Sequence, residues 1–313
     1  MKYIKHYLLF TLVAFCVAAC SSPQTFLQTD INAAINQTMI DEDGETHLIG
    51  VTTRQGFQKA PFQEWFQKNY TTYEVKDPVN KLSKTQLKGV EVLAFMGTWC
   101  GDSKREVPRF YKVMDKIGFE DQNLKLVNVY LDYDRYKQSP TGEEKGLNIH
   151  RVPTFIFYKA GKEIGRIVES PATSMEIDIA QILHGIPSTP NYKVVAHLNN
   201  LYEQGEIDFG NEKMETLADK AAHYSRGGGY ELNTYGHVLL TSGAVKKAIT
   251  TFSINSLAYP DKPYTFSSLG KAYHKNGQID LAIENYEKVL QMEPEEDLEK
   301  IVSDRLVALK KRE

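Results

Sequence analysis

The sequence predicts an α/β domain followed by an all-α repeat domain. Three observations lead to this fold class. Short apolar runs bounded by turn residues alternate with helical patterns between residues 90 and 183. The C-terminal third repeats its apolar and small residues at a constant offset of 34. A single thiol stands where the first apolar run passes into the first long helical segment, and thiols at helix N-termini are reactive.

The central strand is expected over residues 90–96, an apolar run that Gly97 closes. A helix follows from Cys100, with apolar residues at helical spacing, a kink at Pro108 and a stop at Gly118. Cys100 therefore lies at the helix N-terminus. Unpaired backbone N–H groups and the helix dipole favour the thiolate there.

Two further strands are expected at 124–131 and 153–158. A hairpin turn at 159–162 leads into a strand at 163–168, and a final helix covers 175–183. A short helix is expected between the second and third strands. The whole order is therefore strand, helix, strand, short helix, two strands and a helix.

With its motifs, this order resembles the thioredoxin family over residues 70–185. Trp99 and Cys100 match the Trp-Cys of the family's active-site motif, and Lys104 and Pro108 match the lysine and kink proline of the next helix. Residues 152–154, Val-Pro-Thr, match the loop that carries the family's cis proline. The resemblance implies a mixed central sheet flanked by helices.

The same resemblance assigns the site. It makes Cys100 the nucleophile of thiol-disulfide exchange, while Trp99 and Pro153 shape the contact with the substrate. Val152 is expected to pair with the backbone of an extended polypeptide, and Thr154 completes this substrate-binding loop. The family's proline is cis and packs against the nucleophilic sulfur.

Two departures from the family pattern change the expected mechanism. Ser103 stands where the second cysteine of the motif belongs, and Ala94 replaces the family's buried carboxylate. We expect Ser103 to hydrogen-bond the thiolate or the mixed disulfide at Cys100. Without a second thiol in the site, an external thiol must resolve that mixed disulfide. Asp102 places a negative charge beside the sulfur and opposes thiolate formation.

The N-terminal segment resembles a bacterial lipoprotein signal peptide over residues 1–19. Basic residues precede an apolar run, and small residues lead to Cys20, the predicted lipidation site. The alternative, a transmembrane anchor, needs a longer apolar run. The sequence thus predicts a lipid-anchored protein of the bacterial cell envelope that faces the periplasm, with a tether over 20–36. Ser21 and Ser22 favour the outer membrane.

Residues 37–69 are expected to add a hairpin and a helix to the thioredoxin-like domain. Acidic residues at 41–45 include an Asp-Gly turn and lack the ligand spacing of a calcium loop. Phe62, Trp65 and Phe66 indicate a short amphipathic helix.

Residues 230–297 resemble two tetratricopeptide repeats. The equivalent residues, each pair 34 apart, are Leu232/Phe266, Tyr235/Leu269, Gly236/Gly270, Leu239/Tyr273, Gly243/Gly277, Ala248/Ala282, Phe252/Tyr286 and Pro260/Pro294. Residues 186–229 are a linker or a degenerate repeat, and 298–313 form a capping helix. Such repeats hold peptides or partner proteins, or they only buttress the neighbouring domain.

Composition and motifs exclude several functions. The chain of 313 residues has 37 basic and 40 acidic residues, a net charge of −3, and no basic patch for nucleic acid. Its eight histidines show no metal-ligand spacing, and no Gly-rich phosphate loop precedes a helix. We therefore expect no cofactor, no metal and no nucleic-acid partner. His150, near Pro153, is expected to be a solvated loop residue rather than a charge partner of the sulfur.

The sequence thus supports two hypotheses. The first is an enzyme, a monothiol thiol-disulfide oxidoreductase that acts on cysteine-containing proteins or small thiols, with the repeats recruiting the partner. The second is a redox-inactive binding or assembly module at the membrane surface.

Overall fold

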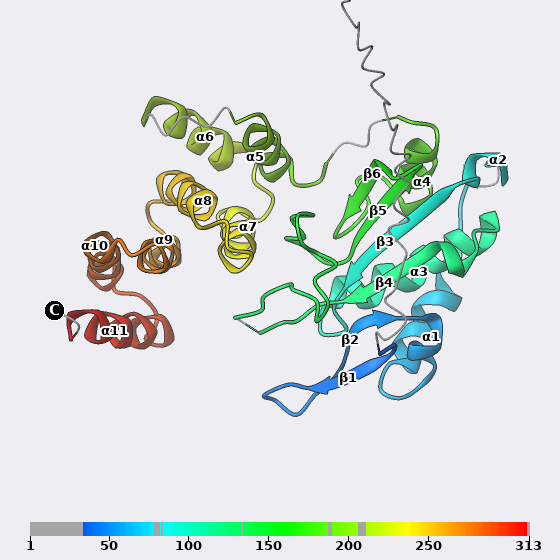
Figure 1. Cartoon of the computed structure of the whole chain (residues 1–313), viewed down its shortest axis with the longest axis horizontal. Coiled ribbons are helices and arrows are strands. Elements are labelled where there is room, and N and C mark those ends of the chain that lie inside the picture. Colours follow the sequence, from blue (N-terminus) through cyan, green and yellow to red (C-terminus); the bar gives the residue numbers. More distant parts are fainter. Residues whose placement is uncertain are drawn as a thin grey trace, which may run out of the picture.

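The computed structural model describes residues 34–77, 82, 84–132, 134–186, 190–205 and 211–311. Figure 1 shows a sheet with its helices next to a separate stack of helices. The predicted signal peptide, Cys20 and the tether as far as residue 33 lie outside the described residues.

A single mixed sheet forms the core of the first domain. Its strands follow the order β1-β2-β4-β3-β5-β6, with β3 and β4 parallel and the other neighbours antiparallel. Their bounds are β1 Gln37–Ile40, β2 Thr46–Thr52, β3 Val90–Met96, β4 Leu124–Asn128, β5 Thr154–Lys159 and β6 Lys162–Val168. The mixed central sheet predicted from the sequence is confirmed.

The N-terminal hairpin is part of this sheet. Strand β2 pairs with β4, so that Gly50 lies opposite Asn128 and Thr52 lies opposite Leu126. The extension predicted over 37–69 therefore contributes its hairpin to the same sheet as strands β3 to β6. The acidic segment after β1 is a turn, in which an Asp41 carboxylate oxygen accepts hydrogen bonds from the backbone N–H groups of Asp43 and Glu45.

Helices cover one face of the sheet. They are η1 Arg54–Gln58, α1 Gln63–Thr72, α2 Lys84–Leu87, α3 Gly101–Ile117 and α4 Met175–Leu183, while the short η3 Asp121–Asn123 leads into β4. Apolar side chains of α3 and α4 meet those of β3 and β5 in the main core, where the rings of Phe110 and Phe155 stack at 4.2 Å. Helix α1 packs beside α3 through Phe66, whose ring contacts that of Tyr111.

The opposite face of the sheet is covered by a loop. Val51, Phe95 and Val127 on this face pack against Ile149 and Val152 of the segment between β4 and β5. The short helix expected in this segment is absent from its described residues, which form turns. Strand β4 ends at Asn128 rather than at residue 131. The chain then pairs with itself, because the N–H of Tyr130 donates to the carbonyl of Gln138.

Seven helices follow in the described C-terminal part. They are α5 Lys193–Gln204, α6 Asn211–Tyr224, α7 Tyr230–Thr241, α8 Val245–Ala258, α9 Pro263–Lys275, α10 Ile279–Gln291 and α11 Glu296–Lys310. Pairs α7/α8 and α9/α10 occupy the two predicted repeats, and α11 packs on α10. Helices α5 and α6 share a core with the first repeat. They lie in the region for which the sequence allowed either a linker or a degenerate repeat. None of the described helices is long and apolar enough to cross a membrane.

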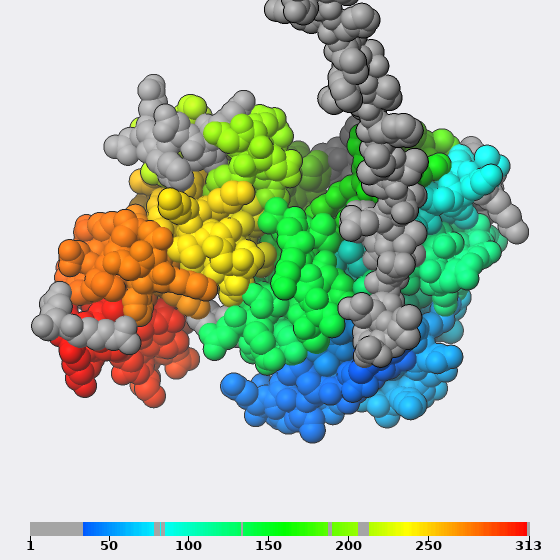
Figure 2. Space-filling model, in the orientation of Figure 1, coloured from blue at the N-terminus to red at the C-terminus, as the bar shows by residue number. Residues whose placement is uncertain are grey.

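The two domains contact each other through the loop after β4. The Gln138 side chain donates to the carbonyl of Thr241 at 3.1 Å, and Asn148 donates to Asn199 at 3.2 Å. Figure 2 shows the green surface of this part of the chain between the yellow repeat helices and the blue hairpin. The helical domain therefore closes one side of the first domain near the loop that carries Pro153.

Candidate functional site

Cys100 lies at the junction of β3 and α3. It is the N-cap residue of α3 and has extended backbone angles, φ −90° and ψ 124°. Its N–H donates to the carbonyl of Gly97 at 2.9 Å, and its carbonyl accepts the N–H of Lys104 at 3.0 Å. The side chain is partly exposed and is the free thiol of the described residues. The predicted position of the thiol at a helix N-terminus is thus observed.

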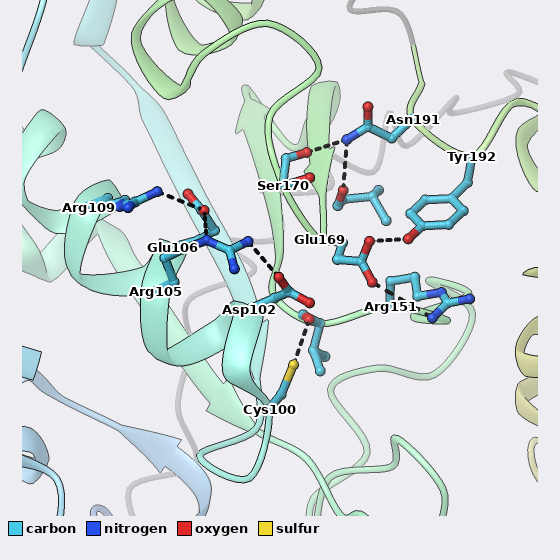
Figure 3. A network of polar contacts seen from close by, with 12 residues as sticks. Cys100, Asp102, Arg105, Glu106, Arg109, Arg151, Glu169, Ser170, Asn191 and Tyr192 are labelled. Atoms are coloured by element: carbon cyan, nitrogen blue, oxygen red, sulfur yellow. Dashed lines mark hydrogen bonds and ion pairs between the residues drawn. The ribbon is translucent and has the colours of Figure 1, made fainter. Parts of the chain in front are cut away.

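The loop with Pro153 lies directly against the sulfur. The Val152–Pro153 peptide bond is cis, and the thiol of Cys100 donates to the Val152 carbonyl at 3.3 Å, as Figure 3 shows. The Thr154 hydroxyl donates to the carbonyl of Arg151 at 2.7 Å and stabilises the turn. The structure therefore brings together four of the residues that the sequence predicted, Cys100, Val152, Pro153 and Thr154.

Trp99 lies against the end of β3, next to Cys100. Its indole N–H donates to the Val129 carbonyl at 3.0 Å. The ring lies so close to the end of β3 that a Cβ at Gly97 would be 2.3 Å from it. Glycine at position 97 is therefore needed for the indole to lie against the backbone beside Cys100.

Ser103 is bonded to the backbone in the thiol form of the site. Its side chain is fully buried, and its hydroxyl oxygen accepts the N–H of Gly97 at 3.3 Å. No hydrogen bond between Ser103 and the sulfur is found among the described residues, where the thiol is bonded to Val152 instead. In the resting thiol form, Ser103 fastens the first turn of α3 to the end of β3.

The charge of Asp102 is neutralised locally. Arg105 donates to Asp102 at 2.5 Å and to Glu106 at 2.6 Å, and Arg109 also reaches Glu106 at 3.1 Å. Figure 3 shows this chain of ion pairs along the first turns of α3. The expected opposition of Asp102 to a thiolate is consequently weakened by its cationic partner.

His150 is not a solvated loop residue. It is 6% exposed, and its ring lies 5.2 Å from that of Tyr192 and 5.8 Å from that of Tyr235. Burial, together with the positive charge of Arg151, lowers the pKa of His150 to about 3. A neutral imidazole cannot serve as a charge partner of the sulfur at neutral pH, so its role lies in the contact between the domains.

Several charged residues near the site were missed from the sequence. Arg151 pairs with Glu169 at 3.7 Å and donates to the carbonyl of Tyr230 at 3.2 Å. Figure 3 shows the hydroxyl of Tyr192 on Glu169 in the same network. Lys137, on the loop after β4, faces Trp99. One sequence signal could have indicated these residues. The segment between the expected strands 124–131 and 153–158 is long, and long loops in compact domains are often functional.

No group of three His, Cys, Asp or Glu residues in the described ranges is arranged to hold a metal ion. The reactive group that the site presents is the Cys100 thiol, which is bonded to the Val152 carbonyl.

Comparisons with known proteins decide the family. A family model for thioredoxin matches residues 73–181. Thioredoxin of Malassezia sympodialis is 33% identical over 97 residues, which cover 29% of this chain and 80% of that protein. Thioredoxin-2 of Saccharomyces cerevisiae is 32% identical over 89 residues, or 28% of this chain and 76% of the relative.

This chain belongs to the thioredoxin family. A thioredoxin-like protein of Acanthamoeba polyphaga mimivirus is 30% identical over 102 residues, and the match spans 63% of that protein and 30% of this chain. A tetratricopeptide-repeat model matches residues 263–296, the second of the two predicted repeats. This chain carries a serine at position 103 and a helical domain beside the site.

Proposed function

We propose that this protein carries out monothiol thiol-disulfide exchange through Cys100. The observation that carries the proposal is the contact between the Cys100 thiol, at the N-cap of α3, and the carbonyl of Val152 before the cis proline. A partly exposed thiol at a helix N-terminus combines access with support for the thiolate. The membership in the thioredoxin family supports the same chemistry.

The reaction proceeds in two exchanges. The Cys100 thiolate attacks one sulfur of a substrate disulfide, forms a mixed disulfide and releases the other sulfur as a thiolate. An external thiolate then attacks the substrate sulfur of the mixed disulfide and frees Cys100. Because each step exchanges one S–S bond for another, no further oxidant or reductant is consumed. Ser103 makes the external thiol necessary.

The test uses the Cys16→Ser/Cys20→Ser background, in which Cys100 is the remaining thiol of the chain. Incubation with glutathione disulfide should add one glutathione, seen by mass spectrometry, and dithiothreitol should release it. The matched control adds Cys100→Ser to the same background. A folded protein that forms no adduct between pH 6 and pH 9 would refute the proposal.

We further propose that Cys20 carries a lipid that anchors the protein in the bacterial envelope, with the outer membrane favoured. The support is the order of basic, apolar and small residues before Cys20. Two or three acyl chains at about 0.8 kcal/mol per buried CH₂ make a stable anchor. Metabolic labelling with a tagged fatty acid should mark the wild type but not Cys20→Ala. Equal labelling of the wild type and of Cys20→Ala would exclude this lipidation site.

A second candidate function is a redox-inactive binding module, with the repeats holding a protein partner. Burial of Ser103 and the apolar Ala94 favour it, because neither helps to resolve a mixed disulfide. The exposed ring of Tyr230 stacks on that of Tyr264 at 4.7 Å and offers an aromatic contact on the repeats. Partner capture that persists in Cys100→Ser, without any adduct in the wild type, would support this candidate over the first.

A further inference from the structure

The proposed exchange requires a group that takes the proton of Cys100. Ala94, fully buried in β3, is apolar and cannot take this proton. The thiol also donates to the Val152 carbonyl. This bond favours the protonated form, because a thiolate has no proton to donate. A proton acceptor therefore has to come from another part of the chain.

Lys137 is a buried amine beside this site. It is 5% exposed although it lies on a loop, and lysine is rarely buried without a reason. Its Nζ lies 5.7 Å from the ring centroid of Trp99, the residue before Cys100, and 3.7 Å from that of Tyr136. It also donates to the Tyr136 hydroxyl. A negative charge on Cys100 acts to raise the pKa of Lys137.

The loop holds Lys137 rigidly. Its N–H donates to the Tyr130 carbonyl at 3.0 Å, and the next residue, Gln138, accepts the N–H of Tyr130 at 2.9 Å. The side chain of Gln138 reaches the carbonyl of Thr241 in α7 at 3.1 Å. Lys137 itself adopts φ +57°, a left-handed conformation that is uncommon for residues other than glycine. These contacts thus hold Lys137 in a strained backbone conformation and fix the position of its side chain.

Charged and titratable groups face Lys137 from every element around it. They are Cys100 of the α3 N-terminus, Arg151 and His150 of the proline loop, Glu169 after β6, Tyr136 of its own loop and His237 of α7. Burial, and then the charge of Arg151, lower the pKa of Lys137 to about 7, while Cys100 and Glu169 act in the opposite direction. A large share of the amine is therefore neutral at pH 7 and able to accept a proton.

We infer that Lys137 is the proton acceptor of the Cys100 site, an inference that rests on the proposed exchange. The neutral amine takes the proton of the Cys100 thiol, which leaves a thiolate on Cys100 and an ammonium on Lys137. No electrons move in this step, and the proton returns when Cys100 is released as a thiol. The ammonium stabilises the thiolate both as it attacks and as it leaves.

The experiment measures the rate of Cys100 alkylation by iodoacetamide from pH 5 to pH 10 in the Cys16→Ser/Cys20→Ser background. Lys137→Met should lower the rate at pH 7 about tenfold and move the midpoint of the profile to higher pH, with a rate near that of the parent at pH 10. Lys137→Arg keeps a cation but cannot accept a proton, so it should also lower the rate at pH 7, and a rate near that of the parent would overturn the inference. If Lys137→Met does not fold, Lys137→Gln carries the same expectation.

The matched control is Lys125→Met. Lys125 is also buried, at 8% exposure, but it lies in β4 and pairs with Glu143 at 3.4 Å. We expect the control to leave the alkylation profile unchanged. A profile of Lys137→Met that coincides with that of the parent would overturn the inference. The glutathione adduct of the parent protein is measured separately, so that loss of the exchange reaction itself is distinguished from loss of the role of Lys137.

Discussion

At the scale of single residues, Lys137 should make stability depend on pH. Burial lowers its pKa from 10.5 to about 7 in the folded chain. Between these values the unfolded chain holds a proton that the folded chain lacks, so the free energy of unfolding rises with pH across this window. Each pKa unit corresponds to about 1.4 kcal/mol, so Lys137→Met should stabilise the protein at pH 6 by up to about 5 kcal/mol.

Urea unfolding at pH 6 and at pH 10 measures this effect. The gain of Lys137→Met should shrink toward pH 10, where the lysine is neutral in the folded chain. A variant that is less stable than the parent at pH 6 would show that the charged lysine is held by favourable contacts. If Lys137 is kept for function at a cost in stability, Lys137→Met should be more stable than the parent and its thiol should be less reactive.

At the scale of elements, the repeated glycines set how closely paired helices approach. A Cβ on Gly236 of α7 would lie 2.4 Å from the ring of Phe252 in α8, and one on Gly270 would lie 2.8 Å from Tyr286. Gly236→Ala should therefore destabilise the protein by about 1–3 kcal/mol, although alanine favours helices. Urea unfolding measures the loss, and adding Phe252→Leu should recover part of it. Gly101→Ala, with open space around it, is the control.

The elements that the sequence predicted well are those with one buried face. Strand β3 and helix α3 followed from their apolar pattern, and the spacing of 34 predicted the helical repeats. The family motif predicted that the loop with Pro153 lies beside Cys100, and in the structure the Cys100 thiol donates to the carbonyl of Val152, before the cis proline.

The segment after β4 could not be predicted in the same way. Its side chains face two domains in turn: Val129 and Ile149 pack on the sheet, whereas Gln138 and Asn148 reach the repeats. Such a segment shows neither the helical nor the strand period. For the same reason the burial of Lys137 and His150 left no signal in the sequence, because the elements that bury them are remote along the chain.

At the scale of the whole molecule, α7 connects the repeats to the thiol site. The ring of Tyr235 lies 5.8 Å from that of His150, and its hydroxyl donates to Asn199. The equivalent position of the second repeat is Leu269, so Tyr235→Leu fits the packing of a repeat while it removes these contacts. We expect amide hydrogen exchange to become faster in residues 129–150, and Cys100 alkylation at pH 7 to fall about threefold as Lys137 loosens.

Phe266→Leu is the matched control, because leucine occupies the equivalent position 232 of the first repeat. Phe266 packs in the outer repeat against Ala282 and Tyr286. This variant should lose a similar amount of packing and leave both exchange in 129–150 and thiol reactivity unchanged. If Tyr235→Leu also left them unchanged, the repeats would only bind partners or support the fold. If Tyr235→Leu alone changed both, the helical domain would be part of the redox site, since it fixes the loop that presents Lys137 to Cys100.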